Sequence, residues 1–322
     1  MTIRLGLLGC GEHSEIGHAI PLARYAASKP GAISLLAACD LRSERAEMFC
    51  KKYGFARAHK DLNQMLANEQ LDACIAVVPV EHIAETGIRL LQAKVPCLVE
   101  KPLGASLDEV KRLREVVRAT NTINMVSVNR RFMPLLNRAI EWTNDMGALR
   151  YVRATMSRHA RTEPDFLRFT AIHAFDTLRF IAGNVRTADI QALNAKSPHW
   201  YAVDLQFESG VRGRIDVLPT AGLLEETYEL LGDGFRSVVT SPFGPQRALH
   251  CYQANQLALE QIAENDITED VVSGFYGEVV ELVEALTEKR RPRPSIEDVF
   301  QSVELCFGLA NRAEENSRAS VV

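Results

Sequence analysis

The sequence lacks the features that mark three large classes of protein. Its 322 residues carry 37 basic and 41 acidic side chains, so no basic excess favours nucleic-acid binding. No apolar run reaches the roughly 18 residues that a membrane-spanning helix needs. Residues 1–4 lead directly into a strand pattern, without the apolar stretch and cleavage site of a signal peptide. We therefore expect a cytoplasmic protein that binds neither nucleic acid nor membrane.

The cysteines also lack any pattern that would indicate disulfides. Their number, seven, is odd, and no two of them form a Cys-x-x-Cys pair. Most lie within apolar runs, which is typical of buried, reduced thiols. The densest basic run, residues 289–293, is interrupted by a proline, and we interpret it as a solvated loop.

What is present is an ordinary globular composition, with 47% hydrophobic residues, in a chain long enough for two domains. Early in the chain, apolar runs alternate with helical periodicity. These runs are residues 3–8, 33–39, 73–78, 96–99 and 123–128. Ser106, with Glu109 three residues later, has the capping-box spacing that begins a helix. The alternation predicts an α/β fold with a doubly wound parallel sheet.

The pattern changes after residue 128. Strand-like segments are joined there by glycine turns at Ser209-Gly210 and Gly232-Asp233-Gly234, which are hairpin signals. They predict an α+β domain with a mainly antiparallel sheet. We expect a first domain at residues 1–128 and a second, which binds substrate and forms oligomer contacts, at residues 129–322.

The first chemical motif is GCGEHS at residues 9–14, between a predicted strand and a predicted helix. Such a glycine turn lets backbone N–H groups and a helix N-terminus approach a pyrophosphate. Gly9 and Gly11 fill the first two glycine positions. Ser14, small enough to keep strand and helix close, replaces the third. The pattern predicts a Rossmann dinucleotide-binding domain.

A carboxylate ends the second predicted strand. Asp40 lies where such a group hydrogen-bonds the adenosine ribose hydroxyls of NAD. The alternative is that Asp40 caps the helix that begins near Ser43. Arg42 lies two residues on and offers a partner for a 2′-phosphate, so the sequence favours NAD and leaves NADP open.

The most specific motif is Glu100-Lys101-Pro102, which follows a buried strand at the edge of the sheet where ligands bind. Upstream, the segment that ends in Pro79 is followed by His82. With these neighbours the triplet resembles the hallmark of the Gfo/Idh/MocA oxidoreductases, the family of glucose–fructose oxidoreductase and inositol dehydrogenase. Further similar segments cover the chain, at residues 129–132, 172–176, 207–211 and 292–298.

The resemblance implies roles for particular residues. Lys101 would lie between nicotinamide and substrate, where an ammonium group stabilises a developing alkoxide. Glu100 would help to hold it. His173 would face Lys101 from the second domain and act in proton transfer. Asp176, one helical turn later, would orient the imidazole or a substrate hydroxyl.

This sequence departs from the family pattern at one position. Relatives commonly have an aspartate one helical turn before the histidine, and here that position is Phe169, followed by Thr170. The departure puts in doubt a two-residue proton relay and a polyol-type substrate. It leaves the work to His173 and Lys101, unless Asp165 or Tyr201 approaches from elsewhere.

The remaining histidines carry weaker signals. His82 begins a helix and is a candidate for cofactor contact, whereas we interpret His13 and His18 as loop or helix residues. No third ligand is spaced to join His173 and Asp176, so we expect no metal site.

Together these patterns predict an NAD(P)-dependent oxidoreductase. It would transfer a hydride to or from a hydroxyl-bearing carbon of a sugar, cyclitol or related small polar molecule. Two alternatives stay open: a lyase or glycosidase that uses transient oxidation by NAD, and a non-catalytic nucleotide sensor. We also expect a homodimer or homotetramer, because a bare apolar sheet face is unlikely in a monomer.

Overall fold

The computed structural model describes residues 2–193, 198–263 and 266–319, which form two compact units. The first unit comprises Met1–Asn129 and Phe275–Phe300. The second comprises Arg130–Gly274 and Gln301–Val322. The first unit therefore includes Phe275–Phe300. The predicted boundary after residue 128 places this segment in the second domain.

The first unit is built on a six-stranded parallel sheet in the order β3-β2-β1-β4-β5-β6. Its strands are β1 (Ile3–Leu8), β2 (Ile33–Cys39), β3 (Arg57–His59), β4 (Ala73–Ala76), β5 (Cys97–Glu100) and β6 (Asn124–Ser127). This is the order of a doubly wound dinucleotide-binding sheet, which confirms the predicted fold. The direction of winding reverses between β1 and β4, so that the loops after these strands diverge and leave a crevice between them.

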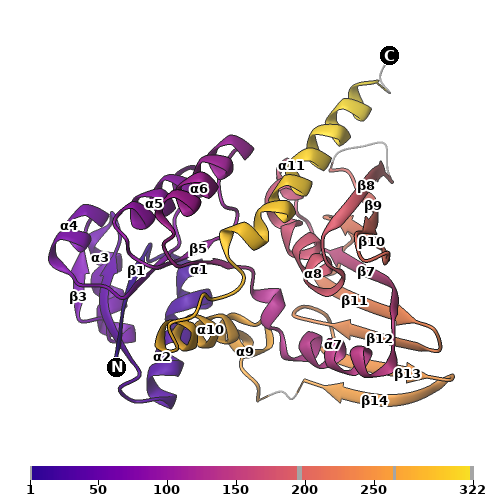
Figure 1. Cartoon of the computed structure of the whole chain (residues 1–322), viewed down its shortest axis with the longest axis horizontal. Helices are drawn as coiled ribbons and strands as arrows, with labels where there is room; N and C mark the ends of the chain where they lie inside the picture. The colour runs from indigo at the N-terminus through magenta and orange to yellow at the C-terminus, as the bar shows by residue number, and fades with distance from the viewer. Residues whose placement is uncertain (1, 194–197, 264–265, 320–322) are drawn as a thin grey trace. The chain divides into compact units, whose positions relative to one another are not determined.

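Helices cover both faces of this sheet. They are α1 (Glu12–Ser14), the π turn η1 (Glu15–Ala19), α2 (Ile20–Ser28), α3 (Ser43–Tyr53), α4 (Leu62–Asn68), α5 (Val80–Gln92), α6 (Leu107–Thr120) and α10 (Phe275–Thr287). Helices α5 and α6 pack together on one face, and α2 packs with α10 on the other (Figure 1). Ser106 begins α6 as predicted, because its hydroxyl accepts a hydrogen bond from the N–H of Glu109.

The second unit contains an eight-stranded sheet in the order β14-β13-β12-β11-β7-β10-β9-β8 (Figure 1). Its strands are β7 (Leu149–Ser157), β8 (Val185–Ala192), β9 (Tyr201–Phe207), β10 (Arg212–Leu218), β11 (Glu225–Gly232), β12 (Phe235–Thr240), β13 (Ala248–Gln253) and β14 (Gln256–Ile262). Among the strands that the structure describes in this sheet, β7 and β10 form the single parallel pair, so the prediction of a mainly antiparallel sheet is confirmed.

This part of the chain also contains helical segments. They are η2 (Asn129–Phe132), α7 (Pro134–Met146), η3 (Phe166–Thr170), α8 (Ile172–Ala182), α9 (Glu269–Val272) and α11 (Ile296–Ala319), of which α11 begins in the first unit. Within the described ranges, no helix combines the length and the hydropathy that crossing a bilayer requires.

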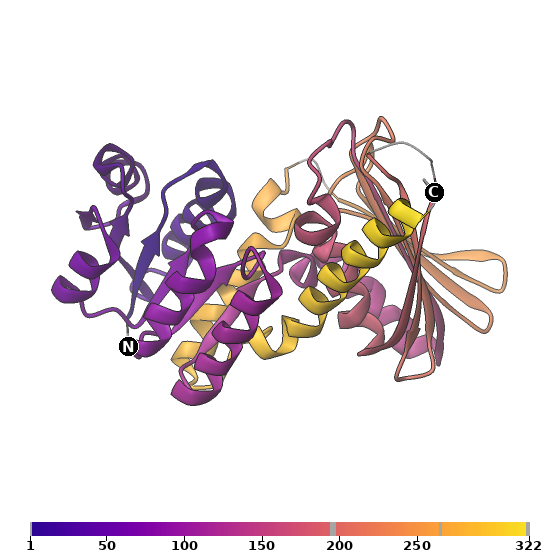
Figure 2. The ribbon, with the colours of Figure 1, turned by 90° about the horizontal axis from the view of Figure 1, so that it is seen from above.

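Helices cover one face of the second sheet. Helix α7 packs on β11, β12 and β13, and α8 packs on β7 and β10, while Figure 2 shows the last part of α11 in yellow on one side of the strands. The opposite face carries ion pairs, among them Arg153 with Asp216 and Arg236 with Glu229. This face therefore carries charged pairs and is not purely apolar, and the homodimer or homotetramer stays a prediction.

Candidate active site

A cavity of about 310 Å³ lies at the carboxyl ends of three strands in the first unit. Residues that follow β1, β4 and β5 line it: Gly11, Glu12, His13, Ser14, Val77, Val78, Pro79, Glu100 and Lys101. The cavity therefore lies where the sheet reverses its winding, which is the place where open α/β sheets bind ligands.

The two glycines of the loop after β1 are required for different reasons. Gly9 has φ +91°, and a Cβ atom there would lie 1.9 Å from the carbonyl oxygen of Val77, so the protein itself excludes a side chain. At Gly11 the nearest atom to such a Cβ is a guanidinium nitrogen of Arg45, 4.0 Å away. This open space beside the backbone fits a loop that a dinucleotide approaches closely, as the sequence predicts.

The helix after this loop changes its winding within one turn. Ser14 is buried, with 1% of its surface exposed. Burial is what we expect of a small residue that lets the helix and the strand pack closely. The next five residues form the π turn η1, after which α2 continues the helix. In an α-helix His13 and His18 would point about 140° apart. The wider π turn brings both rings to one carboxylate.

That carboxylate belongs to Glu100, the last residue of β5. Its Oε1 accepts hydrogen bonds from Nε2 of His13 at 2.9 Å and from Nε2 of His18 at 3.1 Å. Within the described residues, its Oε2 has no hydrogen-bond partner. Burial alone would raise the pKa of Glu100, but the two histidines hold that pKa well below its usual range. Glu100 is therefore a buried anion at the wall of the cavity.

Asp40 directly follows β2 and ties two loops together. Its Oδ2 accepts a hydrogen bond from the N–H of Cys10, and its Oδ1 accepts one from the N–H of Arg42, each at 2.8 Å. Helix α3 begins at Ser43 with no side-chain cap, so Asp40 is not a helix cap. Each carboxylate oxygen retains acceptor capacity for ribose hydroxyls. The Arg42 side chain is exposed.

The other predicted residues of the first unit divide into two groups. Lys101, half-buried directly after β5, and Pro79, directly before α5, both line the cavity. His82 lies in the first turn of α5, is exposed, and is not one of the lining residues. The geometry thus groups Lys101 with the glycine loop and leaves His82 outside that group.

In the second unit, His173 and Asp176 are both buried in α8. The Asp176 carboxylate receives a bidentate pair of hydrogen bonds from Arg131, at 2.7 and 2.8 Å, and another from the Ser302 hydroxyl at 2.8 Å. Such a pair fixes both partners in position. Asp176 thus anchors α8 to Arg131 and Ser302, which fixes the helix that carries His173.

The turn before α8 is also a π turn, η3, closed by the N–H of Ala171 and the carbonyl of Phe166. Phe169, at the position of the missing family aspartate, packs edge-on against Phe307 of α11, with ring centroids 6.1 Å apart. Asp165 forms a surface ion pair with Arg168. Position 169 therefore contributes an aromatic packing contact instead of a carboxylate.

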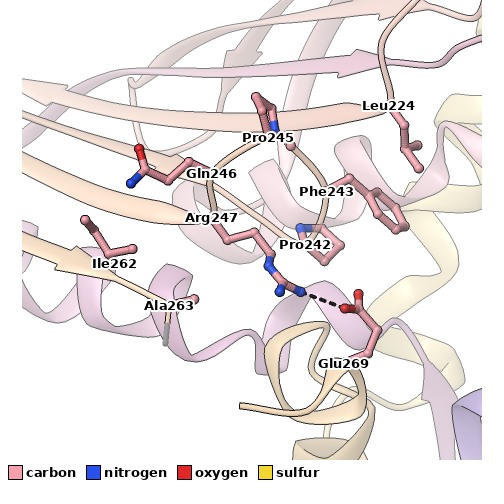
Figure 3. Close-up of a pocket in the computed structure, with 10 residues that line it drawn as sticks. Leu224, Pro242, Phe243, Pro245, Gln246, Arg247, Ile262, Ala263 and Glu269 are labelled. Carbon is pink, nitrogen blue, oxygen red and sulfur yellow. Dashed lines mark hydrogen bonds and ion pairs between the residues drawn. The ribbon is translucent and has the colours of Figure 1, made fainter. Parts of the chain in front are cut away.

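A larger cavity of about 660 Å³ lies in the second unit, outside all predicted site residues. Figure 3 shows its walls, in which Arg247 and Glu269 form an ion pair with 2.6 Å between nitrogen and oxygen. Phe243, another wall residue, lies over the guanidinium groups of Arg130 and Arg158. Throughout the described part of the chain, no three His, Cys, Asp or Glu side chains are arranged so that they could hold a metal ion.

Sequence reasoning missed the contacts of His13 and His18 with Glu100. We interpreted both histidines as loop or helix residues. Residues five positions apart do not share a face of an α-helix, so spacing gave no signal of the shared contact.

Comparison with protein families identifies the first part of the chain. Residues 3–129 match the family described as "Oxidoreductase family, NAD-binding Rossmann fold", GFO_IDH_MocA. The matched region contains the glycine loop, Asp40 and the Glu100-Lys101-Pro102 triplet.

Among curated proteins, myo-inositol 2-dehydrogenase of Thermotoga maritima is 28% identical over 233 residues, covering 66% of this chain and 68% of that protein. The NAD(+)-dependent scyllo-inositol 2-dehydrogenase of Bacillus subtilis is 27% identical over 213 residues, covering 60% of this chain and 62% of that protein. The alignments thus span about two thirds of each relative.

Among solved structures, an oxidoreductase from Agrobacterium radiobacter in complex with NAD+, L-tartaric acid and magnesium superposes with a TM-score of 0.80. It is 17% identical and covers 97% of both chains. At this identity the likeness shows the fold, and it extends through both units.

Proposed function

We propose that this chain is an NAD-dependent oxidoreductase of the Gfo/Idh/MocA family, whose model its residues 3–129 match, and that it oxidises the CH–OH group of a polyol, cyclitol or related sugar-like molecule. One observation carries the proposal: Lys101 and the glycine loop line the same cavity at the winding reversal of the sheet. The inositol dehydrogenases among the relatives support the substrate class.

NAD(P), when bound, accepts or returns the hydride, and the residues of this chain manage the proton and the charge on the substrate oxygen. We assign Lys101 to that oxygen, because an ammonium group stabilises the negative charge that develops there as the C–H bond breaks. Glu100, immediately before it, is a buried anion held by two histidines, and it fixes the end of β5 from which Lys101 projects.

We assign His173 to removal of the hydroxyl proton, since imidazole is an effective base near neutral pH. Asp176 acts as a positioning residue, because its carboxylate is bound to Arg131 and Ser302. Phe169 supplies no carboxylate at this turn, so we assign the proton transfer to Lys101 and His173 alone.

NAD is the preferred cofactor in this proposal. The Asp40 carboxylate presents acceptors to the adenosine ribose hydroxyls and repels a 2′-phosphate. The exposed Arg42 side chain offsets part of that repulsion, which leaves NADP as a weaker alternative.

The proposal is tested with a substrate panel of inositols, acyclic polyols, aldoses and hydroxy acids, each supplied with NAD+ and with NADP+. We expect NADH to form with at least one cyclitol or sugar-like substrate, and more slowly with NADP+. Tight binding of NAD+ without net reduction on any member would contradict the proposal and favour a lyase with transient oxidation or a nucleotide sensor.

A further inference from the structure

The His13–Glu100–His18 cluster reaches the cavity beside Lys101 through two of its members, His13 and Glu100. The His18 side chain is 1% exposed, whereas the His13 side chain is 54% exposed and lines the cavity. An imidazolium costs more to bury than to leave near water. Of the two rings, His13 is therefore the one at which an added positive charge costs less.

The surroundings of His13 determine what its charge does. The anion of Glu100 lies 2.9 Å from its Nε2, and the rings of His18 and Phe275 pack edge-on at 6.4 and 6.0 Å. Two further charged groups, Glu12 and Lys101, line the same cavity. Glu100 carries one negative charge, which balances one imidazolium, so a proton on His13 makes this wall of the cavity electrically neutral instead of negative.

We propose that His13 makes the preference of this site for reduced over oxidised nicotinamide cofactor depend on pH, with the protonated ring favouring the reduced form. The proposal rests on the proposed function, which puts the reacting nicotinamide beside Lys101, and it gives His13 the role of a specificity-determining residue.

The physical reason is a difference of one charge. NAD+ and NADH carry the same diphosphate, and the oxidised nicotinamide ring carries an additional positive charge. A proton on His13 attracts both diphosphates alike, but it repels only the oxidised ring. The ratio of the two dissociation constants therefore isolates the interaction between His13 and the ring. Coulomb's law with intermediate screening gives a change in this ratio of roughly three- to tenfold.

The experiment measures the dissociation constants of NAD+, NADH and ADP-ribose, which lacks the nicotinamide, from about pH 6 to about pH 9. We compare the wild-type protein with His13→Gln, which keeps a donor toward Glu100 but does not titrate. His250→Gln is the matched control, because His250 also contacts a glutamate, Glu260, through Nε2 at 3.1 Å, but lies in the second unit on β13.

In the wild type we expect the ratio Kd(NAD+)/Kd(NADH) to be roughly three- to tenfold larger at the acidic end of the range than at the alkaline end. In His13→Gln the ratio stays constant with pH, and His250→Gln behaves as the wild type. The dissociation constant of ADP-ribose changes with pH in the same way as that of NADH, since neither molecule carries a charged nicotinamide ring.

A ratio that is constant in the wild type, or one that still varies in His13→Gln, overturns the inference while leaving the dehydrogenase proposal intact. The inference is also overturned if the dissociation constant of ADP-ribose changes with pH as that of NAD+ does, because His13 would then not be responding to the charge of the nicotinamide ring. Failure of the wild type to bind either nicotinamide cofactor would overturn the cofactor assignment and this inference together.

Discussion

Each of the two units contains a buried glutamate between two basic side chains, but the basic residues differ. In the first unit Glu100 accepts hydrogen bonds from His13 and His18. Histidine changes its charge near neutral pH, and one of these two rings borders the cavity.

In the second unit Glu226 is fully buried. Arg130 donates to its two carboxylate oxygens at 3.0 and 2.9 Å, Arg158 forms an ion pair with it, and the Tyr228 hydroxyl donates at 2.9 Å. Arginine is charged at every accessible pH. Phe243 lies over both guanidinium groups, with 5.3 Å from each to the ring centroid.

The comparison shows that one arrangement serves two purposes. Two arginines give a permanent charge that keeps Glu226 ionised and fixes β11 to its neighbours. Two histidines give a cluster whose charge changes with a single proton. The histidine version lies at the cavity and the arginine version lies in the core, and the following predictions test that division.

The largest expected effect is on stability in the second unit. Glu226→Gln leaves two buried guanidinium groups without a carboxylate, so we expect a loss of about 3–5 kcal/mol in the free energy of unfolding, measured with urea. Glu269→Gln is the control, since it removes only the surface ion pair with Arg247 and should change stability by no more than about 1 kcal/mol. Equal losses of unfolding free energy in the two variants would show that the buried cluster stabilises the fold no more than a surface ion pair does.

The next effect is on stability in acid. Burial would raise the pKa of Glu226, but Arg130 and Arg158 lower it to about 2. Because the folded-state pKa is depressed, the stabilisation is present above the ordinary glutamate pKa and is lost as pH falls toward 2. Its size is on the order of 3 kcal/mol. Urea unfolding at several acidic pH values should therefore show a steeper loss for the wild type than for Glu226→Gln, and parallel losses would contradict the assignment.

Catalysis gives the third effect. Lys101→Ala and His173→Ala should each lower kcat by ~10²-fold or more, the usual range for losing a group that handles the proton or the oxyanion. Binding of NAD+ should change much less. Lys111→Ala, which changes a surface lysine on α6, is the matched control. If His173→Ala kept a near-normal kcat between about pH 6 and about pH 9, a group other than His173 would be the proton acceptor.

Cofactor choice gives the smallest of these effects. Asp40→Asn removes the charge that opposes a 2′-phosphate but keeps the side-chain shape, so the preference for NAD+ over NADP+ should fall by roughly tenfold. Titration of both cofactors by fluorescence measures this ratio. An unchanged ratio would mean that Arg42 or another group sets the choice.

Local patterns predicted the first unit well. The bounds of β1 and β2 and the start of α6 at Ser106 follow from short-range signals, namely apolar runs and a capping spacing.

Four strands were not predicted: the three residues of β3 in the first unit, and β8, β13 and β14 in the second. Their exposed or mixed faces give little hydrophobic periodicity.

The site was harder to predict where long-range contacts or altered helical winding determine it. Lys101 and the glycine loop belong to sequence motifs, and the fold brings them to one cavity. The contact of His13 with Glu100 depends on the π turn η1, and the pairing of Asp176 with Arg131 joins residues 45 positions apart. Neither follows from spacing along an α-helix.

Hydride transfer from a substrate carbon to the cofactor is the central claim, and isotope transfer tests it most directly. A polyol that the wild type oxidises is deuterated at the reacting carbon and incubated with NAD+, and the cofactor is then analysed by mass spectrometry. The account predicts reduced cofactor that carries the deuterium, formed by the wild type and strongly diminished in Lys101→Ala. Product formation with no deuterated reduced cofactor would contradict it.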